Sequence, residues 1–265
     1  MIGRLRQISA PAVTAAIAAG LLVAFAGGCG SSGRGRSSSA TAAAPTSAPS
    51  RAPIHGNYSP SIDPADFVAR IDNHYFPLEP GTAFHYRGVM EDGKTPQTDD
   101  MVVTRRTKEI LGVKCTVVRD TVRSRGRLIE RTFDWYAQDR AGNVWYMGED
   151  AREVRRGRLV RVSDSWEAGV KGAKAGIIMP GNPRPGDQYR QEYYPRYALD
   201  QARVLGSGGP VSVLAGSFGR TLLTEETSPL DPARERKYYV AGVGDVKERT
   251  VAGNREQIQL VSITR

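Results

Sequence analysis

The sequence predicts a mainly β protein in which a curved antiparallel sheet forms a half-barrel or barrel. From residue 80 onward, runs rich in Val, Thr, Tyr, Trp and Phe alternate with short polar or glycine-bearing turns. Such alternation at regular, short intervals is typical of antiparallel strands. The runs are too many for a flat open sheet, so the sheet is expected to curl.

The first 28 residues predict a secretory signal peptide. Arg4 and Arg6 precede an uncharged, mildly apolar stretch that ends in Ala26-Gly27-Gly28-Cys29. The stretch is too short and too interrupted for a membrane-spanning helix. Small residues before a cysteine resemble the bacterial lipobox, in which the thiol of Cys29 is alkylated by diacylglycerol and the chain is cut before it. The pattern prefers Leu where Ala26 stands, and an ordinary signal peptide cleaved nearby is the alternative.

Residues 29–56 predict a disordered tether that follows the lipidated cysteine. The segment is built from Ser, Ala, Gly and Pro with three arginines and no acidic residue. It cannot bury enough apolar surface to offset its ordering entropy. Five of the basic residues behind the net charge of +9 precede residue 57, which leaves +4 on a single β domain of residues 57–265. This mild excess does not resemble a nucleic-acid footprint, so no nucleic acid is expected as a partner.

The domain is expected to begin with a short helix and continue as a meander of strands. A helical pattern runs from Phe67 to about Ile71, with Asp63 or Asp66 as its cap and Pro64 in its first turn. Four strands joined by short polar turns are then predicted, at residues 114–122, 128–137, 144–147 and onward, and 159–162.

Three motifs recur in the same order about 100 residues apart and favour an internal duplication, with repeats at 80–150 and 185–250. Chance supplies any one of them, because Pro-Gly and paired aromatic residues are common where strands begin. The pairs are Pro80-Gly81 with Pro185-Gly186, Ile110-Leu111-Gly112 with Val213-Leu214-Ala215-Gly216, and Trp135-Tyr136 with Tyr238-Tyr239.

Two segments resemble the opening and closing signatures of a set of uncharacterised bacterial secreted β proteins and lipoproteins. They are the run from Tyr75 to Thr82 (YFPLEPGT) and the run from Tyr238 to Gly244 (YYVAGVG). Phe84 stands where Trp is usual, and Asp245 where Leu is usual. The resemblance covers residues 70–264 and implies no established activity. The family is similar in general appearance to lipoprotein-carrier folds, in which a curved sheet wraps a hydrophobic hollow. The comparison with carrier folds is an analogy and implies no function.

Residues 163–200 predict a long irregular loop across the sheet, because they are rich in Gly and Pro. The loop carries bulky apolar side chains that are not expected to face water together. It is therefore expected either to plug the hollow permanently or to act as a lid over a ligand. The candidate ligand-binding residues are Trp135, Trp145, Trp166, Met179, Arg190, Tyr193 and Tyr194.

The sequence contains no recognisable arrangement of nucleophile and base residues, so the protein is not expected to be an enzyme. Two cysteines and three histidines exclude a zinc cluster, and neither a metal nor a cofactor is expected. Cys115 is expected to be a small buried residue. The carboxylates around one hairpin (Asp134, Asp139, Glu149 and Asp150) are expected to be solvated turn residues, although a pair of carboxylates near Asp134 or Glu192 would suit a hydrolase.

The leading functional hypothesis is a monomeric lipoprotein on the outer face of a bacterial cell membrane. It would bind or carry a lipid or another apolar or amphipathic envelope molecule, with arginines near the headgroup. The alternative is a structural or protein-interaction module whose hollow is filled by its own side chains. A carboxylate-based hydrolase is the third reading.

Overall fold

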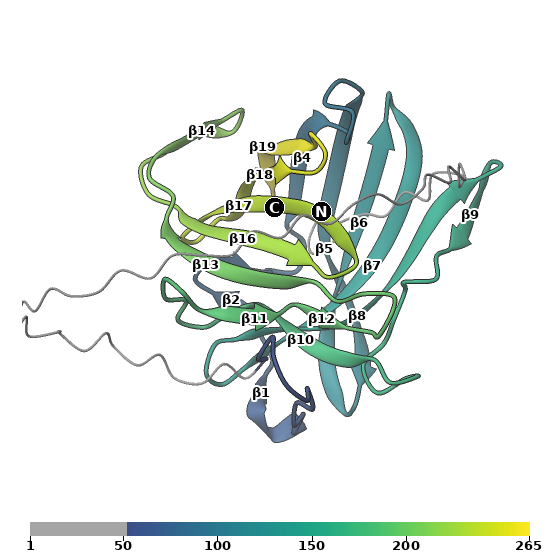
Figure 1. The fold of residues 1–265 in the computed structure, drawn as a ribbon, viewed down its shortest axis with the longest axis vertical. Helices are drawn as coiled ribbons and strands as arrows, with labels where there is room; N and C mark the ends of the chain where they lie inside the picture. The colour runs from purple at the N-terminus through teal and green to yellow at the C-terminus, as the bar shows by residue number, and fades with distance from the viewer. Residues whose placement is uncertain (1–51) are drawn as a thin grey trace, which may run out of the picture. The chain divides into compact units, whose positions relative to one another are not determined.

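The computed structural model describes residues 52–265 of the chain. The predicted signal peptide, Cys29 and nearly all of the predicted tether lie outside this range. The described regular structure is almost entirely antiparallel β, and the main sheet is nearly closed (Figure 1). The predicted fold class is therefore confirmed.

Thirteen strands form the continuous path of the main sheet, and every neighbouring pair is antiparallel. In spatial order they are β11 (Gln188–Arg190), β13 (Gln201–Ser207), β16 (Leu222–Ser228), β17 (Asp231–Val240), β18 (Gly244–Ala252), β19 (Gln257–Thr264), β4 (Ala83–Val89), β5 (Pro96–Ile110), β6 (Val113–Ser124), β7 (Arg127–Asp139), β8 (Val144–Arg155), β10 (Lys174–Met179) and β12 (Glu192–Tyr193).

The remaining strands extend or flank this sheet. β1 (Phe67–Val68) pairs with β7, and β9 (Arg158–Arg161) pairs with β8. Two small hairpins stand apart from the path, formed by β2 (Asp72–Asn73) with β3 (Phe76–Pro77) and by β14 (Val211–Val213) with β15 (Gly216–Phe218).

The two end strands of the path, β11 and β12, are joined by a single residue, Gln191. The chain therefore passes directly from one end of the sheet to the other. The backbone N–H of Gln191 donates to the carbonyl of Asp200, 2.8 Å away, and the Gln191 side chain is fully buried. The sheet thus closes through the covalent backbone at this point.

Closure requires a glycine in β10 opposite this junction. A Cβ on Gly176 would lie 2.2 Å from the carbonyl oxygen of Gln191 and 2.7 Å from the nitrogen of Glu192. Both atoms belong to backbone, which cannot move aside as a flexible side chain does. Gly176 therefore allows the closing segment to lie against β10.

The burial pattern along each strand shows whether one face or both faces of the sheet are covered at that point. β16 alternates strictly between buried and half-buried residues, as expected when one face of a strand is enclosed. Residues 134–139 of β7 and 144–149 of β8 are buried without alternation. On the outer face the Phe67 ring packs edge-on against Trp145, and the Lys108 ammonium lies over the Trp135 ring.

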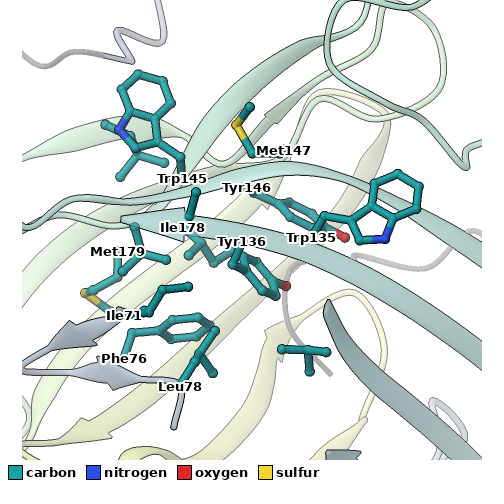
Figure 2. Packing of buried hydrophobic residues seen from close by; sticks show 14 of the residues in the cluster. Ile71, Phe76, Leu78, Trp135, Tyr136, Trp145, Tyr146, Met147, Ile178 and Met179 are labelled. Atoms are coloured by element: carbon teal, nitrogen blue, oxygen red, sulfur yellow. The ribbon is translucent and has the colours of Figure 1, made fainter. Parts of the chain in front are cut away.

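One part of the interior is filled by aromatic and aliphatic side chains. The Phe76 ring lies edge-on to Tyr136, and Tyr136 stacks on Tyr146 with 4.9 Å between centroids. Figure 2 shows Ile71 and Met179 in the same group. These contacts form the apolar core of the described domain.

The expected helix from Phe67 to Ile71 is wrong. A three-residue 3-10 helix, Pro64–Asp66, takes its place, with the Asp63 carboxylate accepting from the Ala65 amide as its cap. The cap and the position of Pro64 agree with the expectation. The helix ends because Phe67 and Val68 pair with β7, where their β-prone side chains pack.

The expected long loop at residues 163–200 is also wrong. β10, β11 and β12 lie within it, and β10 pairs with β8 in the main sheet. Ile177, Ile178 and Met179 are buried because they belong to this strand. The segment is part of the barrel wall, so neither a lid nor a separate plug describes it.

The predicted strands of the meander are confirmed as β6, β7, β8 and β9. The duplication stays a prediction, although the motifs fall in comparable places. β4 to β8 form one run of five neighbouring strands, and β11, β13, β16, β17 and β18 form another. Trp135-Tyr136 lies in the fourth strand of the first run and Tyr238-Tyr239 in the fourth of the second.

The substitution Gly176→Ala is expected to destabilise the fold by about 1–3 kcal/mol, because the new methyl group overlaps backbone at the closing junction. Urea denaturation of the full chain measures the change. Gly219→Ala is the matched control, since a Cβ at Gly219 meets no atom within 4 Å. Equal stability of the two variants would contradict the role assigned to Gly176.

Candidate functional site

The inner face of the barrel is rich in carboxylates. Among the described residues, twelve acidic side chains are buried but only two basic ones, Arg190 and Lys237. The inward-facing acids come from strands on all sides of the barrel: Asp99, Asp120, Glu130, Asp134, Glu149, Glu192, Glu226, Glu235, Asp245 and Glu248. Carboxylates are rarely buried in such numbers, because removing charge from water is costly. We treat this interior as the candidate site.

Lys237 is the basic group of this interior. Its ammonium lies 3.0 Å from Glu226 and 3.6 Å from Glu248, and its side chain is 1 % exposed. These carboxylates raise its pKa well above the ordinary value of 10.5 even though burial acts in the other direction. Lys237 therefore stays charged and holds β16, β17 and β18 together on their inner face.

A second group of carboxylates meets on one tyrosine. The Tyr146 hydroxyl lies 2.7 Å from Asp134 and 2.9 Å from Glu149, which face each other across β7 and β8. A phenol has only one hydrogen to donate. The hydroxyl therefore donates to one carboxylate, and its contact with the other is satisfied only when that carboxyl carries a proton.

Burial raises the pKa of several of these acids. The pKa of Asp120 is well above its ordinary value of 3.8 because the group is buried and because Asp99 adds negative charge. Burial, together with Glu248, does the same for Asp245. The pKa of Glu235 is also raised by burial, and Lys237 opposes that effect. The interior consequently favours protonated carboxyls or a positively charged partner.

Several fully buried polar groups on the inner face have no hydrogen-bond partner. The side-chain nitrogen Nε2 and oxygen Oε1 of Gln191 have no partner, and neither does the Tyr189 hydroxyl. Tyr189 faces the interior, because it lies opposite Ala202, which lies opposite Glu226. Native proteins rarely leave buried polar groups unsatisfied. The Gln191 side chain and the Tyr189 hydroxyl therefore have hydrogen-bonding capacity that no described residue satisfies.

The structure divides the predicted ligand-binding residues among separate places. Asp134 and Tyr136 both contact Tyr146 inside the barrel, so Trp135 between them points outward, where the Lys108 ammonium lies 3.5 Å from its ring centroid. Trp145 also faces outward and donates to Asp139 at 3.0 Å. Figure 2 shows the two indoles at the margins of the cluster.

Trp166 and Met179 belong to the buried core. The Trp166 indole donates to Glu192 at 2.7 Å and lies edge-on to Tyr146. Met179 is fully buried beside β8. Trp166 therefore contacts one of the interior carboxylates, and Met179 packs in the apolar core.

The other three predicted residues lie elsewhere. The Arg190 guanidinium binds the carbonyls of Pro53 and Ile54 and lies 5.1 Å from the Tyr193 ring centroid. Tyr194 stacks on Tyr197, which is largely exposed. Arg190 thus holds the start of the described chain against the barrel.

Sequence reasoning missed the interior carboxylates, although a signal for them exists. In β6, Asp120 lies between Val118 and Val122 at period two, and in β16 Glu226 follows Leu222 and Thr224. An acid in phase with apolar residues shares their face. The expectation that Asp134 and Glu149 are solvated is wrong, because both are buried in neighbouring strands.

The described residues offer little for thiol or metal chemistry. Cys115 is buried, and burial raises the pKa of its thiol to about 12, so the reactive thiolate is scarce. Residues 52–265 contain no group of three or more His, Cys, Asp and Glu arranged to hold a metal ion. The same range contains no helix long and apolar enough to cross a membrane.

The outer face carries a row of arginines. Arg131 lies opposite Arg152, and Arg152 lies opposite Arg161, on β7, β8 and β9. Asp150 contacts Arg152 at 3.0 Å and Arg161 at 3.2 Å. The row remains net positive and is separate from the acidic interior.

Comparisons with known proteins give weak likenesses. No protein-family model matches the chain, and no curated protein matches it. A structure described as an exported protein with a YmcC-like fold from Bacteroides fragilis is 13 % identical, with a TM-score of 0.43 over 73 % of this chain and 100 % of that one. A lipoprotein structure from Parabacteroides distasonis is 10 % identical, with a TM-score of 0.38 over 72 % and 99 %. These values are too low to carry a function to this chain.

The raised carboxyl pKa values predict that the protein is more stable at pH 5 than at pH 7.5. A carboxyl with a raised folded-state pKa retains its proton in the folded state between its ordinary and raised values, so stability falls as the pH rises through that range. Asp120→Asn should raise Tm at pH 7.5 by about 2–4 °C, equivalent to about 1 kcal/mol, and flatten the pH dependence.

Asp92→Asn is the control for this experiment. Hydrogen bonds from the side chain of Thr95 and from the amides of Thr95 and Lys94 lower the pKa of Asp92 to about 2, so its removal should not raise Tm. Calorimetric melts across pH measure both variants. A Tm that rises steadily from pH 5 to 7.5 would refute the assignment.

Proposed function

We propose that this protein is a lipoprotein, anchored through Cys29 on the outer face of a bacterial membrane, whose barrel interior binds an amphipathic envelope molecule. The anchor rests on the sequence alone: the signal peptide, the lipobox-like Ala26-Gly27-Gly28-Cys29 and the tether. The binding function rests on the barrel interior.

The observation that carries the binding proposal is the set of buried polar groups without partners. Gln191 and Tyr189, whose side chains carry these groups, are two residues apart on the closing segment. An unsatisfied buried polar group costs about 1–3 kcal/mol. A ligand that supplies complementary donors and acceptors recovers this free energy, so the interior is suited to binding.

The interior also combines the two surfaces that an amphipathic molecule needs. Tyr136, Tyr146 and Trp166 provide an aromatic region, and the carboxylates on the same strands provide a polar one. Ligand sites commonly pair an apolar lining with a few convergent polar groups. The arginine row on the outer face lies apart from this interior and suits contact with an anionic membrane surface.

Each alternative function has less support. The aromatic cluster of Phe76, Tyr136 and Tyr146 favours an interaction module with a filled interior, but it leaves the Gln191 amide unexplained. The paired carboxylates Asp134 and Glu149 are the observation that favours a hydrolase. Both carboxylates contact the Tyr146 hydroxyl, at 2.7 and 2.9 Å, so they already form a contact between β7 and β8.

A molecule should copurify with the full-length chain at a fixed stoichiometry. Native mass spectrometry from nonionic detergent, followed by organic extraction, detects and classifies it. Gln191→Leu should reduce its occupancy about tenfold or more, because the variant removes the amide groups that the ligand satisfies. Tyr197→Phe, at an exposed position, is the control. An unliganded mass from several hosts would overturn the binding proposal.

Cys29→Ala should move the protein from the membrane fraction to the soluble fraction after export, because an acyl anchor contributes about 0.8 kcal/mol per buried methylene. Fractionation with radiolabelled fatty acid measures both attachment and location. Cys115→Ala is the control, since that thiol is buried in the barrel wall. Label retained in the Cys29→Ala variant would contradict the anchor site.

A further inference from the structure

Two neighbouring hairpin turns at one end of the barrel consist almost entirely of arginine and glycine. The turn between β6 and β7 reads Arg123-Ser124-Arg125-Gly126-Arg127, and the turn between β8 and β9 reads Arg155-Arg156-Gly157-Arg158. Glu130 and Glu153 are paired across β7 and β8, and each turn starts or ends within three residues of this pair. The turns therefore lie at the same end of the sheet, at the upper right of Figure 1. We call them the two arginine tips.

Each tip holds an arginine in a backbone conformation that arginine rarely adopts. The φ angle is 49° at Arg125 and 51° at Arg156, and the glycine that follows each has a φ of 77°. Such paired positive angles are typical of a type I′ turn, which favours Asn, Asp or Gly at the first position. Hydrogen bonds from Thr95 and Lys94 lower the pKa of nearby Asp92 to about 2, and Arg125 adds least to that effect. Local geometry and local contacts therefore leave the choice of arginine unexplained.

Acidic side chains neutralise only part of the charge on the tips. Arg123 binds Asp100 at 2.7 Å, and Arg155 binds Glu153 at 3.1 Å. Among residues 52–265, the tip arginines that form no ion pair with an acidic side chain include Arg127, Arg156 and Arg158. The tips therefore carry a net positive charge at the surface.

Apolar side chains are interleaved with the arginines on the β8–β9 hairpin. Val160 is 41 % exposed, and Val154 and Leu159 lie opposite each other, both half-buried. β9 pairs with β8 alone, so its other edge has no strand partner in the described part of the chain. An arginine can lay its apolar stem along a hydrophobic surface while its guanidinium stays in a polar layer. The hairpin therefore presents the cationic and apolar groups that a lipid headgroup layer accommodates together.

We propose that the two arginine tips dock on an anionic phospholipid surface, with β9 in the headgroup layer. Arginine binds phosphate oxygens through parallel N–H donors, and each basic residue near an anionic membrane adds to the attraction. Two observations favour a membrane over a soluble polyanion. The exposed Val160 gains apolar contact only from lipid, and the lipobox-like segment at Cys29 predicts an anchor that keeps the domain at a membrane. The inference rests on the proposed membrane location and not on a ligand in the barrel.

The test detects contact between β9 and lipid through tryptophan fluorescence. The Val160→Trp variant of the full-length chain, purified as the cell processes it, is combined with vesicles whose acyl chains carry bromine, a contact quencher. Trp135, Trp145 and Trp166 are at most 6 % exposed, so their emission forms a constant background. The introduced tryptophan is expected to be quenched in vesicles that contain phosphatidylglycerol and not in vesicles of phosphatidylcholine alone. Added salt should reverse the quenching, because it screens exposed charges.

Arg125→Asn and Arg156→Asn test the assigned arginines in this background. Asparagine suits the turn conformation, so neither variant should lose stability, which thermal melts verify. Each should weaken docking about fivefold, and both together about twentyfold or more, as measured from the quenched fraction. Lys171→Asn is the matched control, because Lys171 has a φ of 51° and precedes a glycine in a turn outside the tips. It should leave the quenching unchanged.

The outcomes separate this docking surface from the other proposals. Quenching that is absent with phosphatidylglycerol, or equal in the two lipid mixtures, overturns it. Equal losses in Lys171→Asn and in the double arginine variant overturn it as well. An emission change with soluble polyphosphate and none with vesicles would assign the tips to a polyanion instead. Mass spectrometry of the same preparation shows whether Cys29 is acylated, so failure of the anchor is distinguished from failure of the docking surface.

Discussion

The closing of the sheet at Gln191 is the constraint on which the rest of the structure depends. Because one residue joins β11 to β12, the strands at the two ends of the sheet are held together by covalent geometry. This near-closure reduces the exposed edges that an open sheet presents. It also gives the inward-facing side chains of thirteen strands a common interior, so each charged group there acts on the others through a medium of low dielectric constant.

That interior has an unusual charge balance for a protein with a net charge of +9. The basic residues lie mostly outside, as in the row of Arg131, Arg152 and Arg161, while carboxylates dominate the inside. Lys237 compensates only part of this charge. The pKa values of Asp120 and Asp245 rise in consequence, and oxygens such as Gln97 Oε1 remain buried without donors.

Much of the fold follows from sequence pattern, but the site does not. The runs of β6 to β9 were predictable because each is long, rich in β-branched and aromatic residues, and bounded by turn signals. The Asp63 cap was also predictable from its residue type. β11 and β12 escaped notice because strands of two or three residues carry no periodicity, and the glycines around them suggest a loop.

The acids of the site were missed for a different reason. A residue such as Glu226 is assumed to face water, although its phase with Leu222 and Thr224 places it inside. Trp135 and Trp145 are candidates for the hollow on the sequence, yet the register turns both outward, where Lys108 and Phe67 pack against them. Which face of a strand is enclosed depends on closure, and closure is a property of the whole sheet.

A crystal structure of the full-length protein, purified from its own membrane without exchange of bound molecules, tests the central claim most directly. The account predicts electron density for a bound molecule in the barrel, within hydrogen-bond distance of the Gln191 side chain and the Tyr189 hydroxyl. A closed barrel whose interior holds only its own side chains and water would contradict it.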